Sequence, residues 1–171
     1  MKQLVKVLLF LLCCSFLSGC FSIDNYSYLR CSIINRCSDT LGVKTIGVAP
    51  NPDISGLVRE NQLDYFKPES GKCIYSFSWE YYDTVDYRDH FNDIFAAQDA
   101  RIEIYDKNGI LLRCWKESDK DTEPDNIFNI DNWRVSHSNH QLKKLCGEVY
   151  GEQDEFYCDY FITPEMLGLK E

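Results

Sequence analysis

The sequence predicts a mainly β protein, an antiparallel β-sandwich with one or two short helical segments that follows an N-terminal signal helix. Several segments alternate apolar and polar residues as half-buried strands do, and turn residues separate these segments at short intervals. The length of 171 residues corresponds to roughly one domain. With 44% hydrophobic and 14% aromatic residues, the composition excludes a disordered chain.

The N-terminus carries an export signal. Lys2 and Lys6 precede residues 7–17, an uncharged apolar run that is shorter than the about 20 residues a membrane-spanning helix needs. A positively charged start, a short apolar stretch and the small residues Ser18 and Gly19 are typical of a cleaved signal peptide.

The segment Leu17-Ser18-Gly19-Cys20 resembles the lipobox of bacterial lipoproteins. The resemblance implies that Cys20 is diacylated on its sulfur, that the chain is cleaved just before it, and that its new amine is acylated. Three acyl chains would hold the protein durably, because a single chain gives only marginal membrane binding. The alternatives are a plain secretory signal with an incidental cysteine, and an internal apolar segment of the fold.

The same resemblance divides the chain into a signal peptide, 1–19, a tether, 20–27, and one sandwich domain, 28–171. Phe21 follows the lipobox cysteine, whereas in the enterobacterial sorting rule an Asp at this place retains lipoproteins at the inner membrane. The expected location is therefore the outer membrane, with the periplasmic and the surface face both open.

The first strands are predicted from their apolar faces. Leu29, Cys31 and Ile33 alternate with polar residues from Tyr28 onward, and residues 41–48 form a second strand. Broken alternation in that second strand predicts a bulge. Turns or loops are expected at 35–39, 51–61 and 68–71. One face of the next strand carries Cys73, Tyr75, Phe77 and Trp79.

A β-hairpin is predicted over residues 100–115, with a type I turn from Asp106 to Gly109. A two-residue loop would pair Ile104 with Arg113 and Asp106 with Leu111. A three-residue loop with Gly109 in the left-handed region pairs Ile104 with Leu112, Ile102 with Cys114 and Glu103 with Arg113. The second register keeps apolar residues together, so we favour it.

The remaining elements are less regular. Residues 87–97 are expected to hold a helical turn or two with Phe91, Ile94 and Phe95 on one side, and residues 116–131 an acidic loop. A strand is expected at 132–136 around Trp133, a short helix is a candidate at 140–146 within the ambiguous segment 137–152, and a last strand at 156–163 ends before Pro164.

The layout is similar to that of small Bacteroidetes lipoproteins with one immunoglobulin-like β domain, a family to which no activity is assigned. The resemblance implies an immunoglobulin-like sandwich and an envelope location, and the cysteine-rich, helix-like stretch before the last strand departs from it. The matching segments are Ile34-Asn35, Asp39-Thr40-Leu41, Phe66-Lys67-Pro68-Glu69-Ser70, Asn126-Ile127-Phe128-Asn129, Trp133, and Tyr160-Phe161-Ile162-Thr163-Pro164-Glu165-Met166-Leu167.

Six cysteines follow Cys20, and an exported protein can form disulfides. Cys37 and Cys146 fall in predicted loops and are the preferred bridged pair, although sequence alone does not choose among the connectivities. The alternative is free thiols, since buried cysteine is an ordinary small hydrophobe. Those on predicted apolar strand faces are Cys31, Cys73, Cys114 and Cys158.

Neither candidate metal site is convincing. His137 and His140 would share a helix face, but zinc catalysis needs a third ligand, which only Cys146 or His90 offers, so exposed histidines are expected. Asp119, Asp121 and Glu123 have the spacing of a calcium loop. Pro124 stands where that loop requires Gly, and Ile130 replaces its bidentate Glu, so we expect a solvated acidic loop.

An aromatic segment with nearby carboxylates could stack against sugars, although core filling is the commoner role of such aromatics. Its residues are Trp79, Tyr81, Tyr82 and Tyr87, with Asp83, Asp86 and Asp89. Two tripeptides, Asp39-Thr40-Leu41 and Asp83-Thr84-Val85, resemble the O-glycosylation acceptor of Bacteroidetes.

The functional prediction is a membrane-anchored binding or interaction module of the cell envelope, with a glycan or a protein as ligand. A pI near 4.8 and a net charge of −9 argue against nucleic-acid binding, which needs clustered Lys and Arg. Nucleophile-elbow, zinc-protease, phosphate-loop and dinucleotide motifs are absent from the sequence, so we expect no enzyme, cofactor or metal. The alternatives are a passive structural component and a carbohydrate-active enzyme.

Overall fold

A computed structural model describes residues 26–48, 61–80, 86–95, 99–143 and 149–169. The predicted signal peptide, its helix, the lipobox and most of the tether lie outside these residues. Tyr26 already belongs to the first strand, which therefore begins slightly earlier than the predicted domain start at Tyr28.

The chain forms a mainly β structure of two four-stranded sheets, as predicted. The long sheet has the order β4-β1-β8-β7, with β1 at Tyr26–Asn35, β4 at Gly71–Glu80, β7 at Arg134–Lys143 and β8 at Val149–Ile162. The short sheet has the order β3-β2-β5-β6, with β2 at Leu41–Ile46, β3 at Asp64–Phe66, β5 at Arg101–Tyr105 and β6 at Leu111–Lys116. Neighbouring strands are antiparallel except for β1 and β8, the first and the last, which run parallel.

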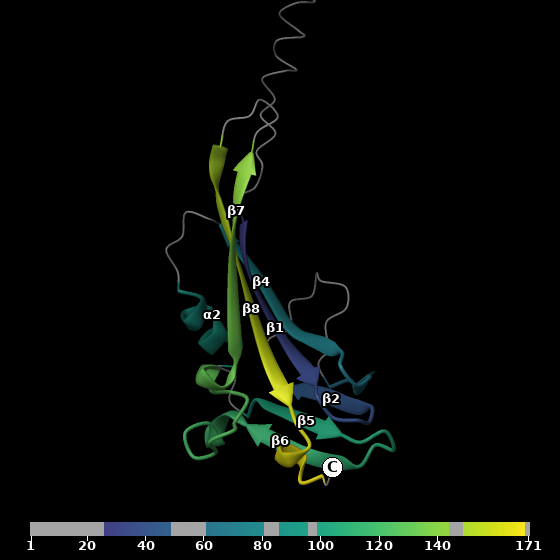
Figure 1. Ribbon diagram of the computed structural model, residues 1–171. Coiled ribbons are helices and arrows are strands. Elements are labelled where there is room, and N and C mark those ends of the chain that lie inside the picture. The colour runs from purple at the N-terminus through teal and green to yellow at the C-terminus, as the bar shows by residue number, and fades with distance from the viewer. Residues whose placement is uncertain (1–25, 49–60, 81–85, 96–98, 144–148, 170–171) are drawn as a thin grey trace, which may run out of the picture.

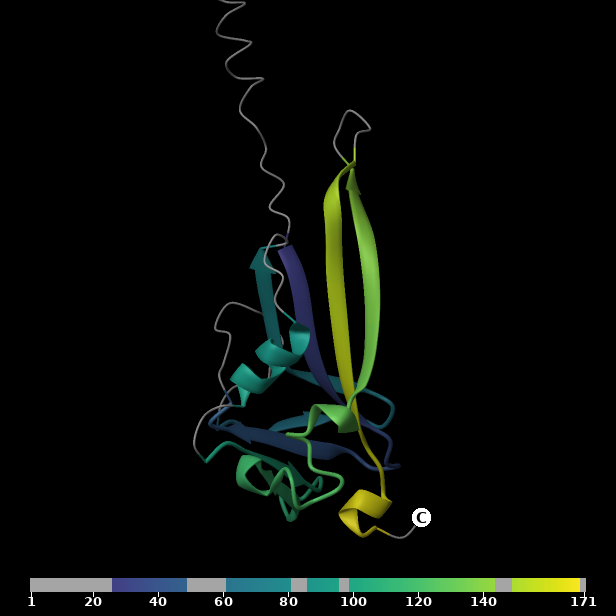
Figure 2. The same ribbon diagram turned by 90° about the vertical axis from the view of Figure 1, so that its left-hand side faces the viewer.

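The short sheet lies across the lower end of the long sheet, and its strands run across the direction of the long ones (Figures 1 and 2). The β7–β8 hairpin extends the long sheet upward beyond the sandwich (Figure 2). The start of β1 therefore lies far from the short sheet, whereas the end of β8 lies beside it.

The core fills the space between the two inner faces. Its central side chains are all at most 1% exposed: Leu29, Cys31, Ile33, Leu41, Val43, Ile102, Ile104, Trp115, Cys158, Tyr160 and Ile162. The helix α2, Tyr87–Ile94, closes one side, as predicted for this segment. Phe91 packs edge-on against Trp133 at 5.3 Å between ring centroids, and Phe95 against Phe128 at 4.9 Å. The side chain of Ile94 lies outside the described residues.

The bulge expected in the second strand is not there. β2 keeps one register along β5, and Thr45 occupies the buried position where alternation demands an apolar residue. The change of face comes after the strand, at Gly47, whose φ of 67° turns the chain so that Val48 is buried. Because the small β-branched Thr45 fits on the inward face of β2, the strand needs no bulge to keep its alternation.

A bulge occurs instead in β4. Cys31 pairs with Tyr75 but the next residue, Ser32, pairs with Cys73, so Ile74 is the extra residue. Cys73 therefore lies on the face of Ser32 and not on that of Tyr75, which corrects the expected single face.

The hairpin has the turn that was predicted but not the register that was favoured. Asp106 Oδ1 accepts hydrogen bonds from the N–H groups of Asn108 and Ile110, and Gly109 has a φ of 81°. The favoured register holds only beside the turn; after a bulge in β6, Ile104 pairs with Arg113 and Ile102 with Trp115. Trp115 is fully buried there, and burying this large ring outweighs the pairing of Ile102 with the smaller Cys114.

Two expectations for the C-terminal half are also wrong. The segment 140–146 does not begin a helix, because β7 continues to Lys143 and pairs with a β8 that begins at Val149. The acidic loop is not solvated throughout: Ile127 and Phe128 are buried. Short 3-10 helices lie at Glu117–Asp119, Ile130–Asn132 and Glu165–Leu167, the last of them following Pro164.

Candidate functional site

The outer face of the short sheet gathers most of the side chains that could bind a ligand. Leu41, Val43 and Ile104 point inward, so the alternate positions on the same strands point to solvent. Register places Gly42 between Tyr65 and Tyr105, and it places Arg101 opposite Lys116. We call this surface the outer face; it consists of Gly42, Lys44, Tyr65, Arg101, Glu103, Tyr105, Leu111, Cys114 and Lys116.

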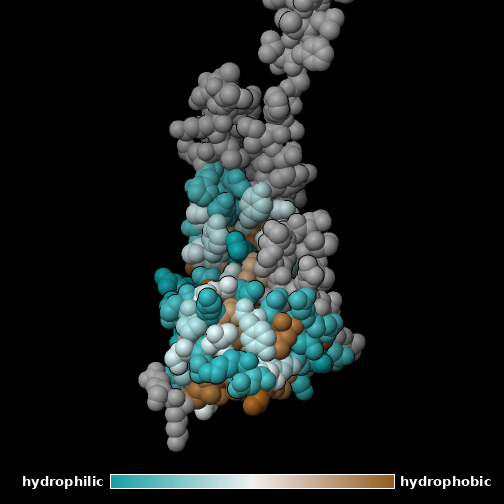
Figure 3. Space-filling model, turned by 90° about the vertical axis from the view of Figure 1, so that its right-hand side faces the viewer, coloured by the Kyte–Doolittle hydropathy of each residue, from teal (hydrophilic) through white to brown (hydrophobic). Residues whose placement is uncertain are grey.

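One half of the outer face is apolar. Tyr65 is 44% exposed, Leu111 50%, and the adjoining Ile110 62%. A methyl group at Gly42 would lie 3.1 Å from Cε1 of Tyr65, so the glycine lets this ring lie against the sheet. Hydrophobic side chains show among hydrophilic ones at the lower end of the molecule, where the short sheet lies (Figure 3). An aromatic ring fixed on a sheet can stack against an apolar ligand face.

A chain of hydrogen bonds runs along β5 on the same face. The Tyr105 hydroxyl donates to Oε2 of Glu103 at 2.5 Å, and Arg101 Nε donates to Oε1 at 3.0 Å. The hydrogen bond to Glu103, followed by burial and the carboxylate charge, raises the pKa of Tyr105 to about 12. Glu103 thus holds both neighbours, and its side chain is only 13% exposed.

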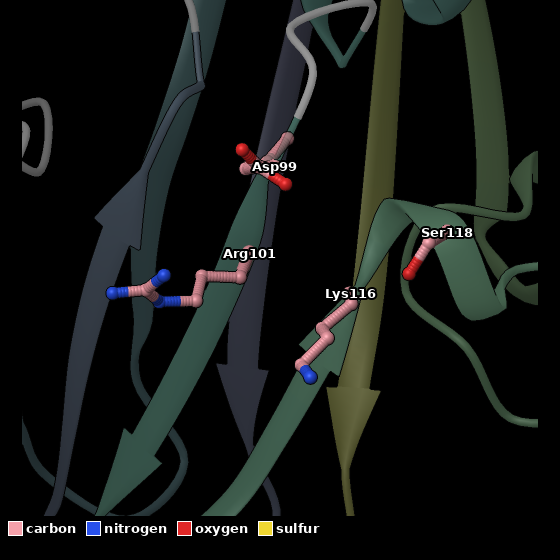
Figure 4. A pocket seen from close by; sticks show the side chains of 5 residues that line it. Asp99, Arg101, Lys116 and Ser118 are labelled. Atoms are coloured by element: carbon pink, nitrogen blue, oxygen red, sulfur yellow. The ribbon is translucent and has the colours of Figure 1, made fainter.

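A small pocket lies at the other end of the outer face (Figure 4). Its volume is about 220 Å³, and it is lined by Asp99, Ala100, Arg101, Lys116 and Ser118. Arg101 extends from β5 and Lys116 from β6, Asp99 lies at the start of β5, and Ser118 lies just beyond β6 (Figure 4).

Two basic side chains, Arg101 and Lys116, share this pocket with the carboxylate of Asp99. Arg101 and Lys116 are direct cross-strand partners, and like charges in that position destabilise a sheet. Arg101 is compensated by Glu103, whereas Lys116 forms no ion pair with any residue the structure describes. A carboxylate, sulfate or phosphate group of a ligand would pair with the ammonium of Lys116. The hydroxyl of Ser118 already donates to Oδ1 of Asp119 at 3.0 Å.

A larger pocket of about 620 Å³ lies near the C-terminal 3-10 helix. Its charged side chains are already paired: Arg36 with Glu69, and Asp39 with Lys107 at 3.1 Å. These ion pairs join the turns of neighbouring strands. The charged side chains of this pocket are therefore less available to a ligand than those of the outer face.

The predicted disulfide is tested at one end only. Cys37 lies in the loop between β1 and β2, as predicted, and it is buried beside the carbonyl of Ile162, with 3.8 Å from its sulfur to that oxygen. Burial raises the pKa of its thiol. Cys146 lies outside the described residues, so the Cys37–Cys146 bridge stays a prediction. Cys20 and its lipidation lie outside them as well.

The histidine pair does not share a face. His137 and His140 lie on the strand β7, where residues three apart point to opposite sides. His137 Nε2 is 2.6 Å from Oδ1 of Asp154, and His140 Nε2 is 3.4 Å from Oε2 of Glu155. His90 packs on Phe77 from α2, with 4.7 Å between ring centroids. Among the described residues, no group of three or more His, Cys, Asp and Glu side chains is placed to hold a metal ion.

Of the four aromatic side chains in segment 79–87, the structure describes that of Tyr87. Its ring stacks on Phe156, with 4.7 Å between centroids, and packs against the core. The side chains of Trp79, Tyr81 and Tyr82 lie outside the described residues, as does Asp83-Thr84-Val85. In the acidic segment, Asp119 and Asp121 are not drawn to a common centre with Glu123, which instead lies near Arg113, 3.8 Å from its Nη2.

Sequence reasoning did not single out the outer face. The available signal was the polar row between buried positions of the hairpin, Arg101, Glu103 and Tyr105, which alternation assigns to solvent. No known protein-family model and no curated protein matches this chain. Among the residues described, the helices are too short and too polar to cross a bilayer.

Proposed function

We propose that the protein is a lipid-anchored lipoprotein of the bacterial outer membrane, held by acylated Cys20, and that its sandwich domain is a binding module without enzymatic activity. The observation that carries the binding role is the outer face, which has exposed apolar side chains at one end and, at the other, a pocket with Lys116, whose ammonium is paired with no described acidic residue. Contiguous exposed apolar side chains on a folded domain often mark an interaction site.

The orientation of the domain supports this proposal. β1 begins at Tyr26, shortly after Cys20, and its ten residues span about 33 Å along the long sheet. The short sheet lies at the far end of β1 (Figure 2). A lipid at Cys20 would therefore place the outer face away from the membrane, where an envelope ligand can reach it.

The chemistry of the outer face restricts the ligand. Tyr65 and Leu111 offer an apolar contact, and Lys116 in the pocket beyond them offers a cation to a negatively charged group. A ligand that joins an apolar face to an acidic group fits both halves; an acidic glycan and an acidic protein segment are of this kind. Nucleic acid is not proposed, because the chain has a net charge of −9.

Hydroxyl-radical footprinting tests the binding role without a known ligand. Tyr65 and Tyr157 are matched probes, 44% and 40% exposed, on different sheets. Radicals generated by X-ray radiolysis should oxidise both tyrosines in the purified full chain. In intact cells Tyr65 should be protected several-fold relative to Tyr157.

A charge reversal at the pocket provides the control. Lys116→Glu should reduce the protection of Tyr65 in cells, whereas Lys72→Glu on β4 should not. Equal oxidation ratios for the two tyrosines in cells and in purified protein would favour a passive structural component instead.

A further inference from the structure

Two buried cysteines lie side by side in the long sheet. Cys31 of β1 and Cys158 of β8 are register partners on adjacent parallel strands, and both are 0% exposed. Partners on neighbouring strands point to the same face, and here the two thiols are within hydrogen-bonding distance of each other. Tyr75 and Val135 continue the row on either side, so both thiols lie in an apolar layer.

Backbone geometry at this position is compatible with a covalent bond. Hydrogen-bonded strands lie about 4.8 Å apart, within the Cα separation of about 4.4–6.8 Å that disulfides span. Cys73 shares the face of Ser32, which is the face of the long sheet opposite to Cys31, and Cys114 lies on the short sheet. Cys37 follows β1 and contacts the end of β8. Of the described thiols, only Cys31 and Cys158 are register partners.

We infer that Cys31 and Cys158 are joined by a disulfide when the chain folds under oxidising conditions. The two thiols lose two protons and two electrons as the S–S bond forms, and a disulfide-containing oxidant accepts the electrons and is reduced to two thiols by exchange. Because both sulfurs are buried in the folded protein, this exchange precedes or accompanies folding. The bond ties the first strand to the last, so it closes a loop of most of the domain, and long loops gain most from cross-linking.

Oxidative refolding of the full chain tests the inference, and its result does not depend on lipidation or on a ligand. The denatured, reduced protein is refolded with oxidised glutathione, denatured again without reductant, and alkylated. Peptide mapping should recover the segments of Cys31 and Cys158 as one linked species, lighter than the two thiol peptides by two hydrogen atoms. Cys114→Ala is the matched control and should keep this species.

Stability provides a second readout. Reduction should lower the urea midpoint of wild type and of Cys114→Ala by more than it lowers that of the double variant Cys31→Ala, Cys158→Ala. If both sulfurs of refolded wild type are alkylated, or if reduction raises its midpoint, the inference is overturned. Export is proposed separately, so failure of this bond to form in vitro would leave the binding role of the outer face intact.

Discussion

At the scale of single residues, Glu103 organises the polar part of the outer face. It sits between Arg101 and Tyr105 on the same side of β5, because residues two apart on a strand share a face. Its two carboxylate oxygens accept one hydrogen bond from each neighbour. Tyr105 therefore ionises only by placing a phenolate beside a carboxylate.

This arrangement predicts a stability change at alkaline pH. The pKa of Tyr105 is about 12 in the folded protein and about 10 in an unfolded chain. The stabilisation from protonated Tyr105 is complete below the unfolded pKa and is lost as the pH rises through the folded one. Urea unfolding should show that wild type loses more stability than Tyr105→Phe across this window.

Glu103→Gln completes the test, since a neutral amide no longer opposes the phenolate. In that variant the pKa of Tyr105 should move down toward the ordinary tyrosine value in a spectrophotometric titration referenced to Tyr105→Phe. Identical alkaline stability profiles for wild type and Tyr105→Phe would show that the hydrogen bond between Tyr105 and Glu103 contributes nothing to the stability of the folded protein.

At the scale of elements, the β5–β6 hairpin depends on Gly109. Its φ of 81° lies in the left-handed region, and a Cβ there would have open space around it except for Tyr65 Oη at 3.8 Å. The cost of replacing it is therefore conformational and not steric.

Gly109→Ala should lower the free energy of unfolding by about 1–2 kcal/mol, the usual penalty for an L-residue in the left-handed region. Gly109→Asn should cost less, because asparagine tolerates this conformation. Chemical denaturation of both variants measures the difference. An alanine variant as stable as wild type would contradict the observed turn.

Strands that bury one face could be predicted from the sequence. Strands with both faces largely exposed could not be predicted in this way. Leu29, Cys31 and Ile33 marked β1 because the core selects apolar residues at alternate positions. His137 and His140 lie on β7, an edge strand of the long sheet, where most of the described side chains are not buried and alternation therefore carries little signal. The register of the β5–β6 hairpin could not be predicted from the sequence either, because it depends on where Trp115 fits in the core.

At the scale of the whole molecule, the two ends of the sandwich differ. β1 and β8 run parallel from the upper end toward the short sheet, and the outer face is assembled at the lower end from four short strands. This juxtaposition arises from non-local pairing, as in the contact of Gly42 with Tyr65 and Tyr105, which local sequence patterns do not specify. The candidate site could therefore be recognised only in the folded chain.

The proposed role depends on fixing the upper end of the domain to a lipid bilayer. Metabolic labelling of bacterial cells that express the full chain with radiolabelled palmitate tests this most directly, with Cys20→Ser as the control. The wild-type protein should carry label in the membrane fraction, and the Cys20→Ser variant should carry none. An unlabelled wild-type protein that retains residues 1–19 would contradict the anchored orientation of the outer face.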